Sequence, residues 1–248
     1  IHNTTYIGPN CIIEENVKIG KNNKFFSNVV ITGNTEIGDN NIFYPFSTIG
    51  TNPQDLKYKG EKSFLYIGNN NTFREYVTVN TGTEGGGLKT IIENNCLFMV
   101  SSHIAHDCKI KSNVILANNA TLAGHVEISE NAVLGGNSAV HQFVKIGKYA
   151  MIGGMSGVEK NIIPYGLYTG IRSELKGMNV VGLKRKGLTS AKINNIINIV
   201  KKIFNSSNSI EKNINTLSKD HLVLEEIVEI IQFIDNYQKR GICKLIDD

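Results

Sequence analysis

The sequence lacks the features that mark several large classes of protein. No apolar run approaches the roughly 18–20 residues that a membrane-spanning helix needs, so membrane insertion is not expected. Only four of the 248 residues are cysteine, and they form no CxxC pair. This argues against a disulfide framework and favours a reducing, cytoplasmic location. The net charge of +4 is too small to indicate a nucleic-acid partner.

The start of the chain leaves one question of location open. Nothing at the start resembles a signal peptide, which again favours the cytoplasm. The first residue is Ile1 rather than Met, so a targeting segment removed before it stays an alternative.

Positive charge is concentrated in one stretch. Between Lys176 and Ile210 there are seven basic residues and no Asp or Glu. Such a stretch is either a solvated helix face or a docking surface for an acidic partner, and the charge alone does not decide between them.

A six-residue repeat governs the first two thirds of the chain. Aliphatic or aromatic residues stand at every sixth position over residues 1–49, 67–79 and 92–158, which makes 24 positions. A period of six fits neither the 3.6 of a helix nor the alternation of an ordinary strand. It is typical of a hexapeptide solenoid, in which three hexads form one triangular coil. We therefore expect about eight coils, stacked into a rod on the order of 40 Å long.

The repeat predicts a mainly β chain built around a parallel β-helix over residues 1–165. The rhythm breaks at 51–66 and 80–91, which we expect to project as binding loops. A polar connector is predicted over 166–187, followed by a small C-terminal α-helical domain over 188–248. Known hexapeptide solenoids wind left-handed, so a left-handed β-helix is expected from that resemblance.

Two apolar stripes at helical spacing predict the C-terminal helices. The first follows a possible N-cap at Thr189 or Ser190. Its members are Ile193, Ile196, Ile197, Val200 and Ile203. The members of the second stripe are Val223, Ile227, Ile230, Ile231 and Ile234. We expect both stripes to pack against each other and against the last coils.

The coil length places histidines on one edge of the rod. Because three hexads make 18 residues, His106 is expected to stack on Gly124, and Asp107 on His125. Four of the six histidines fall on this edge: His103, His106, His125 and His141. Such convergence favours a functional site over four isolated polar groups.

Two chemistries compete for this edge. The histidines can bind a divalent metal, or one imidazole can act as general base for acyl transfer to a hydroxyl. In the second case, the backbone N–H of Gly124 beside His106 is suited to stabilise an oxyanion. The residues alone favour the general base and leave the metal open.

Six segments carry a more specific signal. They are Asn52–Glu61, Gly85–Leu88, Ser102–Cys108, Leu116–Val126, Ala139–Phe143 and Gly182–Gly187. In content and order they resemble the signature stretches of the bacterial UDP-N-acetylglucosamine O-acyltransferases. The resemblance covers nearly the whole chain. It implies transfer of an (R)-3-hydroxyacyl group from acyl carrier protein to the 3-hydroxyl of UDP-N-acetylglucosamine, the first step of lipid A synthesis.

The resemblance also implies the setting of the reaction. The enzyme would be cytoplasmic, in a Gram-negative-type bacterium, and would work as a homotrimer with active sites between neighbouring rods. It would need no metal and no cofactor of its own, because phosphopantetheine arrives on the carrier protein. The basic stretch would then dock the acidic carrier protein.

The resemblance assigns three catalytic residues. His106 corresponds to the general base, Asp107 orients or polarises its imidazole, and the Gly124 N–H faces the thioester oxyanion. Gly154 corresponds to the position whose bulk limits the acyl chain. Because glycine leaves the groove open, we expect a donor of about 12–14 carbons, estimated from burial per methylene.

The resemblance also assigns substrate contacts. Those for the amino sugar and the incoming acyl group are Gln54, Asp55 and Lys57. Those for the sugar, the diphosphate or the acyl-pantetheine are His103, His125, His141 and Gln142. Those for the UDP portion are Asn179, Arg185 and Lys186. Two positions depart from the family pattern: Val181 replaces an acidic residue, and Lys186 replaces an arginine, which removes a bidentate fork.

Three alternatives to this enzyme remain at this point. The first is the N-acyltransferase that acts on UDP-acylglucosamine in the same pathway, which usually carries an additional N-terminal domain. The second is a metal-dependent lyase on the same solenoid. The third is a structural or ice-binding solenoid, which repeated Thr-x-Thr ladders would favour; only isolated threonines occur here.

Overall fold

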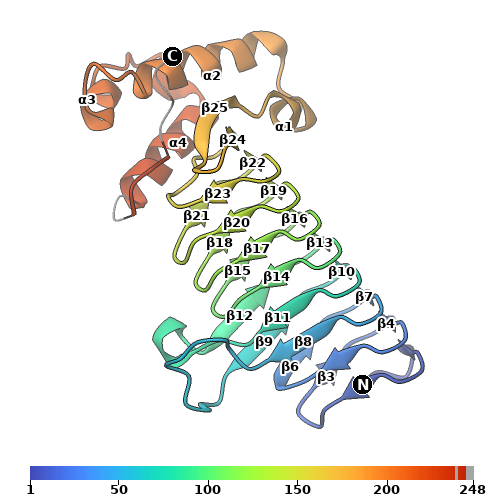
Figure 1. The fold of residues 1–248 in the computed structure, drawn as a ribbon. Helices are drawn as coiled ribbons and strands as arrows, with labels where there is room; N and C mark the ends of the chain where they lie inside the picture. The colour runs from blue at the N-terminus through green and yellow to red at the C-terminus, as the bar shows by residue number, and fades with distance from the viewer. Residues whose placement is uncertain (238–239, 244–248) are drawn as a thin grey trace.

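The computed structural model describes residues 1–237 and 240–243, and it forms the predicted β-helix with helices at one end (Figure 1). Each hexad contributes one short strand and one corner. The periodic side chains point into the rod, and all of them are buried except Ile1, Ile7 and the partly buried Ile13 in the first coil. The mainly β fold class predicted from the period is confirmed.

Three parallel sheets form the sides of the rod. Sheet A contains β1 (Tyr6–Ile7), β4 (Lys24–Phe25), β7 (Ile42–Phe43), β10 (Thr72–Phe73), β13 (Leu97–Phe98), β16 (Ile115–Leu116), β19 (Val133–Leu134), β22 (Met151–Ile152), β24 (Gly166–Thr169) and β25 (Glu174–Met178). Sheet B contains β2 (Ile12–Ile13), β5 (Val30–Ile31), β8 (Thr48–Thr51), β11 (Thr78–Asn80), β14 (His103–Ile104), β17 (Thr121–Leu122), β20 (Ala139–Val140) and β23 (Gly157–Val158). Sheet C contains β3 (Lys18–Ile19), β6 (Asn34–Ile37), β9 (Phe64–Ile67), β12 (Lys89–Ile92), β15 (Lys109–Ile110), β18 (Glu127–Ile128) and β21 (Lys145–Ile146).

Identical positions of successive coils stack inside the rod. On sheet A, a column of phenylalanines runs from Phe25 through Phe43 and Phe73 to Phe98, with neighbouring ring centroids 4.6–4.9 Å apart. In the regular coils the register shifts by 18 residues, as where His103 pairs with Thr121. This register is what allows spacing in the sequence to be converted into adjacency in space.

The corners between sheets need unusual backbone angles. At most corners one residue has φ near +60°, and asparagine occupies many of these positions because it tolerates the left-handed region. Asp107 (φ 59°) and His125 (φ 61°) occupy the same position in successive coils, at the corner between sheets B and C. The candidate catalytic edge is therefore a row of corners.

The two projecting loops are shorter than predicted. They comprise residues 52–63 and 81–88, because β8 continues to Thr51, β9 begins at Phe64, β11 continues to Asn80 and β12 begins at Lys89. The expected bounds of 51–66 and 80–91 included strand residues. The longer strands of sheet C pair over four residues there, which anchors both loops at their bases. Both loops leave the rod on the same side (Figure 1).

The prediction of a polar connector over residues 166–187 is wrong, because this segment contains two strands and a helix. Strands β24 and β25 form an antiparallel hairpin that extends sheet A, and α1 (Val180–Arg185) follows it. The physical reason is burial: Tyr168, Leu175 and Met178 close the end of the hydrophobic core.

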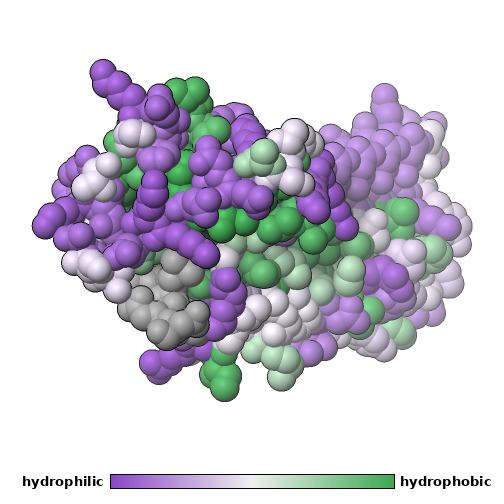
Figure 2. Space-filling view, turned by 90° about the horizontal axis from the view of Figure 1, so that it is seen from above, coloured by the Kyte–Doolittle hydropathy of each residue, from purple (hydrophilic) through white to green (hydrophobic). Residues whose placement is uncertain are grey.

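Three further α-helices, α2 (Ser190–Ile203), α3 (Ile210–Asn215) and α4 (Glu225–Asn236), gather at this end of the rod (Figure 1). Short 3-10 helices are η1 (Glu84–Gly86) and η2 (His221–Val223). Thr189 is the N-cap of α2, and its side chain accepts from the Lys192 N–H. Viewed from above, hydrophilic residues cover much of this end, with hydrophobic residues visible between them (Figure 2).

The second predicted apolar stripe is partly wrong. Val223 lies in η2 before α4 begins and is 81% exposed, whereas Ile227, Ile230 and Ile234 are buried and Ile231 is partly buried. The buried Phe233 was not predicted. In the described part of the chain, no helix combines the length and apolar character that crossing a bilayer demands.

Candidate active site

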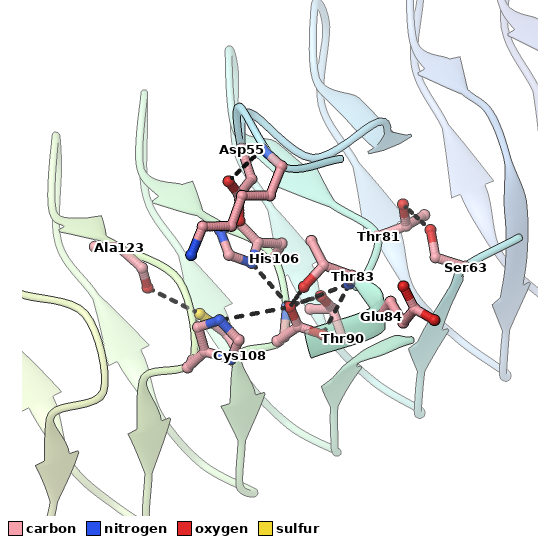
Figure 3. A network of polar contacts seen from close by, with 12 residues as sticks. Asp55, Ser63, Thr81, Thr83, Glu84, Thr90, His106, Cys108 and Ala123 are labelled. Atoms are coloured by element: carbon pink, nitrogen blue, oxygen red, sulfur yellow. Dashed lines mark hydrogen bonds and ion pairs between the residues drawn. The ribbon is translucent and has the colours of Figure 1, made fainter. Parts of the chain in front are cut away.

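His106 and Asp107 form a buried pair at the corner between β14 and β15. Asp107 Oδ2 lies 2.8 Å from His106 Nδ1 (Figure 3). An ionised carboxylate can only accept hydrogen bonds, so Nδ1 carries the proton and donates it to Asp107. Nε2 is then the unprotonated nitrogen, available as an acceptor. The pair thus has the tautomer that a general base requires.

The second loop holds the Asp107 carboxylate. The Thr83 N–H donates to Oδ1 at 2.9 Å and to Oδ2 at 3.1 Å, and the Thr83 hydroxyl donates to Oδ2 at 2.6 Å. The Asp107 N–H donates to the Thr90 hydroxyl at 2.8 Å. Burial alone would raise the pKa of Asp107, but the hydrogen bonds from His106 and Thr83 outweigh it and lower that pKa. Asp107 is therefore a carboxylate at neutral pH.

Gly124 lies directly against the imidazole, as the 18-residue spacing predicts. A Cβ added at Gly124 would stand 2.5 Å from His106 Nε2, so only glycine fits beside the ring. Within residues 1–237 and 240–243, the Gly124 N–H donates to no backbone carbonyl. This N–H is available to bind an oxygen of a substrate that approaches Nε2.

A cleft of about 650 Å³ lies between the two loops and the histidine edge. Asp55 and Lys57 line it from the first loop, and Asp55 Oδ2 is 4.0 Å from His106 Nε2. On the opposite side His125 lies edge-on to His106, with ring centroids 5.0 Å apart, and stacks on Phe143 at 4.4 Å. Burial lowers the pKa of His125, although Asp107 acts against that shift. His125 is therefore largely uncharged at neutral pH.

The other two histidines of the edge lie on either side of this pair: His103 begins strand β14 in the same coil as His106, and His141 follows β20 two coils further on. His103 Nδ1 lies 2.7 Å from the Thr78 hydroxyl, and burial followed by the nearby His106 lowers the pKa of His103. His141 is exposed and contacts the guanidinium of Arg240, with Gln142 as its neighbour in the next position. Gln54 does not line the His106 cleft. It faces an adjacent groove instead.

The residues assigned to the UDP portion lie elsewhere on the chain. Asn179 and Arg185 line a groove of about 690 Å³ beside sheet A, together with the exposed Val181. Asn179 also caps α1 by accepting from the Gly182 N–H at 3.0 Å. Lys186 lines no part of this groove.

Lys186 is engaged within the protein. Its ammonium donates to Oε1 of the buried Glu226 of α4 at 2.9 Å, and the Lys192 ammonium donates to the same oxygen at 3.1 Å. Burial opposes the charged form of Lys186, but Glu226 outweighs it and raises the pKa of that lysine. Lys186 therefore links α1 to α4, and its side chain does not line the groove that Arg185 lines.

Gly154 lies at a third corner, between sheets A and B. A Cβ there would meet only backbone atoms of Gly136, its carbonyl oxygen at 3.2 Å and its nitrogen at 3.9 Å, so a longer side chain has room to point away from the rod. The assigned residues thus divide among different corners of the triangular coil. His106 and its neighbours lie between sheets B and C, Gly154 between A and B, and Arg185 beside sheet A.

Ligand atoms of His106, Asp107 and His125 lie within 4.8 Å of one another, a spacing that a metal ion could use. Asp107 Oδ2 already accepts hydrogen bonds from His106 Nδ1 and the Thr83 hydroxyl. An ion bound to Asp107 Oδ2 would compete with these hydrogen bonds. The hydrogen bonds account for the arrangement of this cluster without an ion.

Sequence reasoning missed Thr83 and Thr90, the residues that hold Asp107. The interruption of the hexad rhythm located the loop but could not show which of its side chains turns back to the rod. One feature of the sequence could have pointed to Thr83. It stands just before the turn at Gly85–Gly87, a position where hydroxyl residues commonly cap a helix or turn.

The solenoid and its buried histidine–aspartate pair, with a glycine N–H beside the ring, define an acyltransferase of the hexapeptide-repeat class. Residues 16–51 and 89–124 match the bacterial transferase hexapeptide family. Residues 161–243 match the family described as UDP N-acetylglucosamine O-acyltransferase, domain 2.

Individual proteins agree with this match over nearly the whole chain. The acyl-[acyl-carrier-protein]–UDP-N-acetylglucosamine O-acyltransferases of Thermodesulfovibrio yellowstonii and Rickettsia canadensis are each 46% identical to it. These alignments cover 96% of this chain and 92% and 90% of the relatives. The solved UDP-N-acetylglucosamine O-acyltransferase of Moraxella catarrhalis is 36% identical, with a TM-score of 0.92 over 98% of this chain and 94% of that one. The chain therefore belongs to the acyl-[acyl-carrier-protein]–UDP-N-acetylglucosamine O-acyltransferase family.

Proposed function

We propose that this protein transfers an (R)-3-hydroxyacyl group from acyl carrier protein to the 3-hydroxyl of UDP-N-acetylglucosamine, as the first step of lipid A synthesis. The relatives' names supply the carrier and the acceptor. The observation that carries the proposal is the buried His106–Asp107 pair, whose unprotonated Nε2 lies 4.0 Å from Oδ2 of Asp55, a residue that lines the cleft. This family assignment favours O-acyl transfer over the N-acyltransferase, lyase and structural-solenoid alternatives.

The geometry supports a direct transfer without an acyl-enzyme. His106 Nε2 takes the proton of the sugar 3-hydroxyl as that oxygen attacks the thioester carbonyl carbon. Asp107 stabilises the imidazolium, and the Gly124 N–H stabilises the oxyanion of the tetrahedral intermediate. The intermediate then collapses, the C–S bond breaks, and the phosphopantetheine thiolate leaves with the proton returned by His106. Asp55 and Lys57 hold the acceptor in the cleft above the ring.

The acceptor atom can be tested with two nucleotides. Purified enzyme with a 3-hydroxyacyl carrier thioester is offered UDP-N-acetylglucosamine or its 3-amino analogue, and the products are separated by mass spectrometry. The proposal predicts an ester from the first nucleotide and at least about ten-fold slower reaction with the second. Preferential formation of the amide would contradict the assigned acceptor.

The distribution of the assigned residues supports a homotrimer with shared sites. A triangular coil holds its corners apart, so the His106 edge and the Arg185 groove of one chain face different directions. One sugar nucleotide can meet both only if a second copy brings its Arg185 groove to the His106 edge. We therefore propose that neighbouring rods each complete the other's active site.

Mixed oligomers test this shared arrangement. His106→Ala and Arg185→Ala variants are each expected to be nearly inactive alone. Co-expressed and co-purified, they should regain activity, because some interfaces then carry an intact His106 from one chain and an intact Arg185 from its neighbour. Activity of the mixture equal to the sum of the two separate variants would contradict the proposal.

The basic stretch is proposed as the docking surface for the acidic carrier protein. Two lysines of this stretch are not available for docking, because Lys186 and Lys192 are already paired with Glu226. Lys201 and Lys202, in the last turn of α2, are exposed. A soluble carrier and a nucleotide sugar as substrates fit a cytoplasmic site of action.

A further inference from the structure

We propose that Thr83 is a positioning residue for acyl transfer, which sets the orientation of Asp107 and through it that of the His106 imidazole. This inference rests on the proposed role of His106 as general base. Thr83 is almost fully buried and provides three hydrogen-bond contacts to the carboxylate from its N–H and its hydroxyl. His106 and Thr83 thus hold Asp107 from two sides.

The second loop is built to hold Thr83 at this place. Gly86 packs on the Asp107 carboxyl group so closely that a Cβ at that position would overlap it. The first loop supports the turn from outside, because the Glu61 carboxylate accepts from the Glu84 N–H at 3.2 Å. Figure 3 shows Thr83 and His106 pointing toward the same site from the loop and from the rod. The second loop therefore holds Asp107 in place, and the first loop in turn holds the second.

The hydroxyl of Thr83 limits the positions that the carboxylate can take. It donates to Oδ2, the oxygen that also accepts from His106 Nδ1. Without this donor, the Asp107 carboxylate can turn away from Nδ1, and the imidazole then loses the partner that sets its orientation. The other titratable groups facing the pair are Asp55 from the first loop, His125 from the next coil, and His103 and Cys108 beside the corner. They are unchanged by a substitution at Thr83.

The test compares two threonines of the same loop. Thr83→Val removes the hydroxyl and keeps the shape and the N–H, whereas Thr83→Ser keeps the hydroxyl. Thr81→Val is the matched control, because the Thr81 hydroxyl accepts from the Ser63 hydroxyl at 2.8 Å, whereas the hydrogen bonds to the Asp107 carboxylate in the described residues come from Thr83 and His106. For each variant, kcat and the KM values for both substrates are measured at one pH and one salt concentration.

The expected result is specific to Thr83→Val. Its kcat should fall about ten-fold, the cost expected for loss of a hydrogen bond to a charged group, with both KM values within about two-fold. Thr83→Ser should restore kcat, and Thr81→Val should change neither kcat nor KM. An unchanged kcat in Thr83→Val, a loss that Thr83→Ser does not restore, or an equal kcat loss in Thr81→Val would overturn the inference.

A second variant reaches Asp107 without altering Thr83. Gly86→Ala pushes a methyl group into the carboxyl group and should lower kcat with the same preservation of KM, even if Thr83→Val fails to fold. Unchanged kcat in folded Gly86→Ala would count against a fixed Asp107. The same variants show which of the two hypotheses is wrong. If His106 is not the general base, His106→Ala remains active. If only the inference about Thr83 is wrong, His106→Ala is inactive while Thr83→Val has normal activity.

Discussion

Gly124→Ala is expected to inactivate the enzyme by moving His106 rather than by removing any functional group. The new Cβ would lie 2.5 Å from Nε2, whereas ordinary contact with a Cβ begins at 3.4 Å. The ring must therefore shift by roughly 1 Å, although it is 97% buried and tied to Asp107. A misplacement of about 1 Å costs about 100-fold in rate when reacting groups must be aligned. Overpacking should also destabilise the fold by about 1–3 kcal/mol.

A double-mutant cycle separates this cause from a general effect at the corner. In His106→Ala the imidazole is absent, so adding Gly124→Ala should cost almost no further stability. Chemical denaturation of the four proteins measures the coupling, and steady-state acyl transfer measures the rate loss of the single Gly124→Ala variant. Two results would refute the contact between the ring and the glycine as the cause of the inactivation. One is equal destabilisation by Gly124→Ala in the wild-type and His106→Ala backgrounds, and the other is near-normal turnover of the single Gly124→Ala variant.

Three further perturbations have defined outcomes. Gly154→Met should shift preference from 14- to 10-carbon 3-hydroxyacyl carriers, by up to about 0.8 kcal/mol per methylene excluded, measured as a ratio of kcat/KM values. Charge reversal at Lys201 and Lys202 should raise KM for the carrier at low salt and lose its effect at high salt. Glu226→Gln should lower the free energy of unfolding by about 3 kcal/mol in denaturant titration, because it leaves two lysines without their partner. Unchanged donor preference, carrier KM or stability would contradict the respective assignment.

The period of the sequence was sufficient to predict the solenoid and the adjacency of the residues on the candidate catalytic edge. Strand pairing is parallel and repeats at coil length, so a spacing of 18 residues became adjacency for His106 and Gly124, and for Asp107 and His125. A one-residue shift of phase after the loops could be recognised because the inward side chains resume their rhythm at Ile92.

The six-residue period could not predict the structure of the segments that lie outside the repeat. The hairpin after Pro164 closes the core with Tyr168 and Leu175, but its composition resembles a polar connector. The pairing of Lys186 with Glu226 joins segments 40 residues apart, and no local pattern indicates it. Thr83 acts on Asp107 across a loop whose path depends on tertiary contacts. These contacts determine which polar residues are free for substrates.

The central claim is that His106, held by Asp107, removes the proton of the acceptor hydroxyl. Single-turnover transfer from a saturating 3-hydroxyacyl carrier to UDP-N-acetylglucosamine tests it most directly, when wild type is compared with a folded His106→Ala variant that still binds both substrates. The rate should fall by about 10²–10⁴-fold, the usual contribution of a general base. Transfer by His106→Ala within a few-fold of the wild-type rate would contradict the claim.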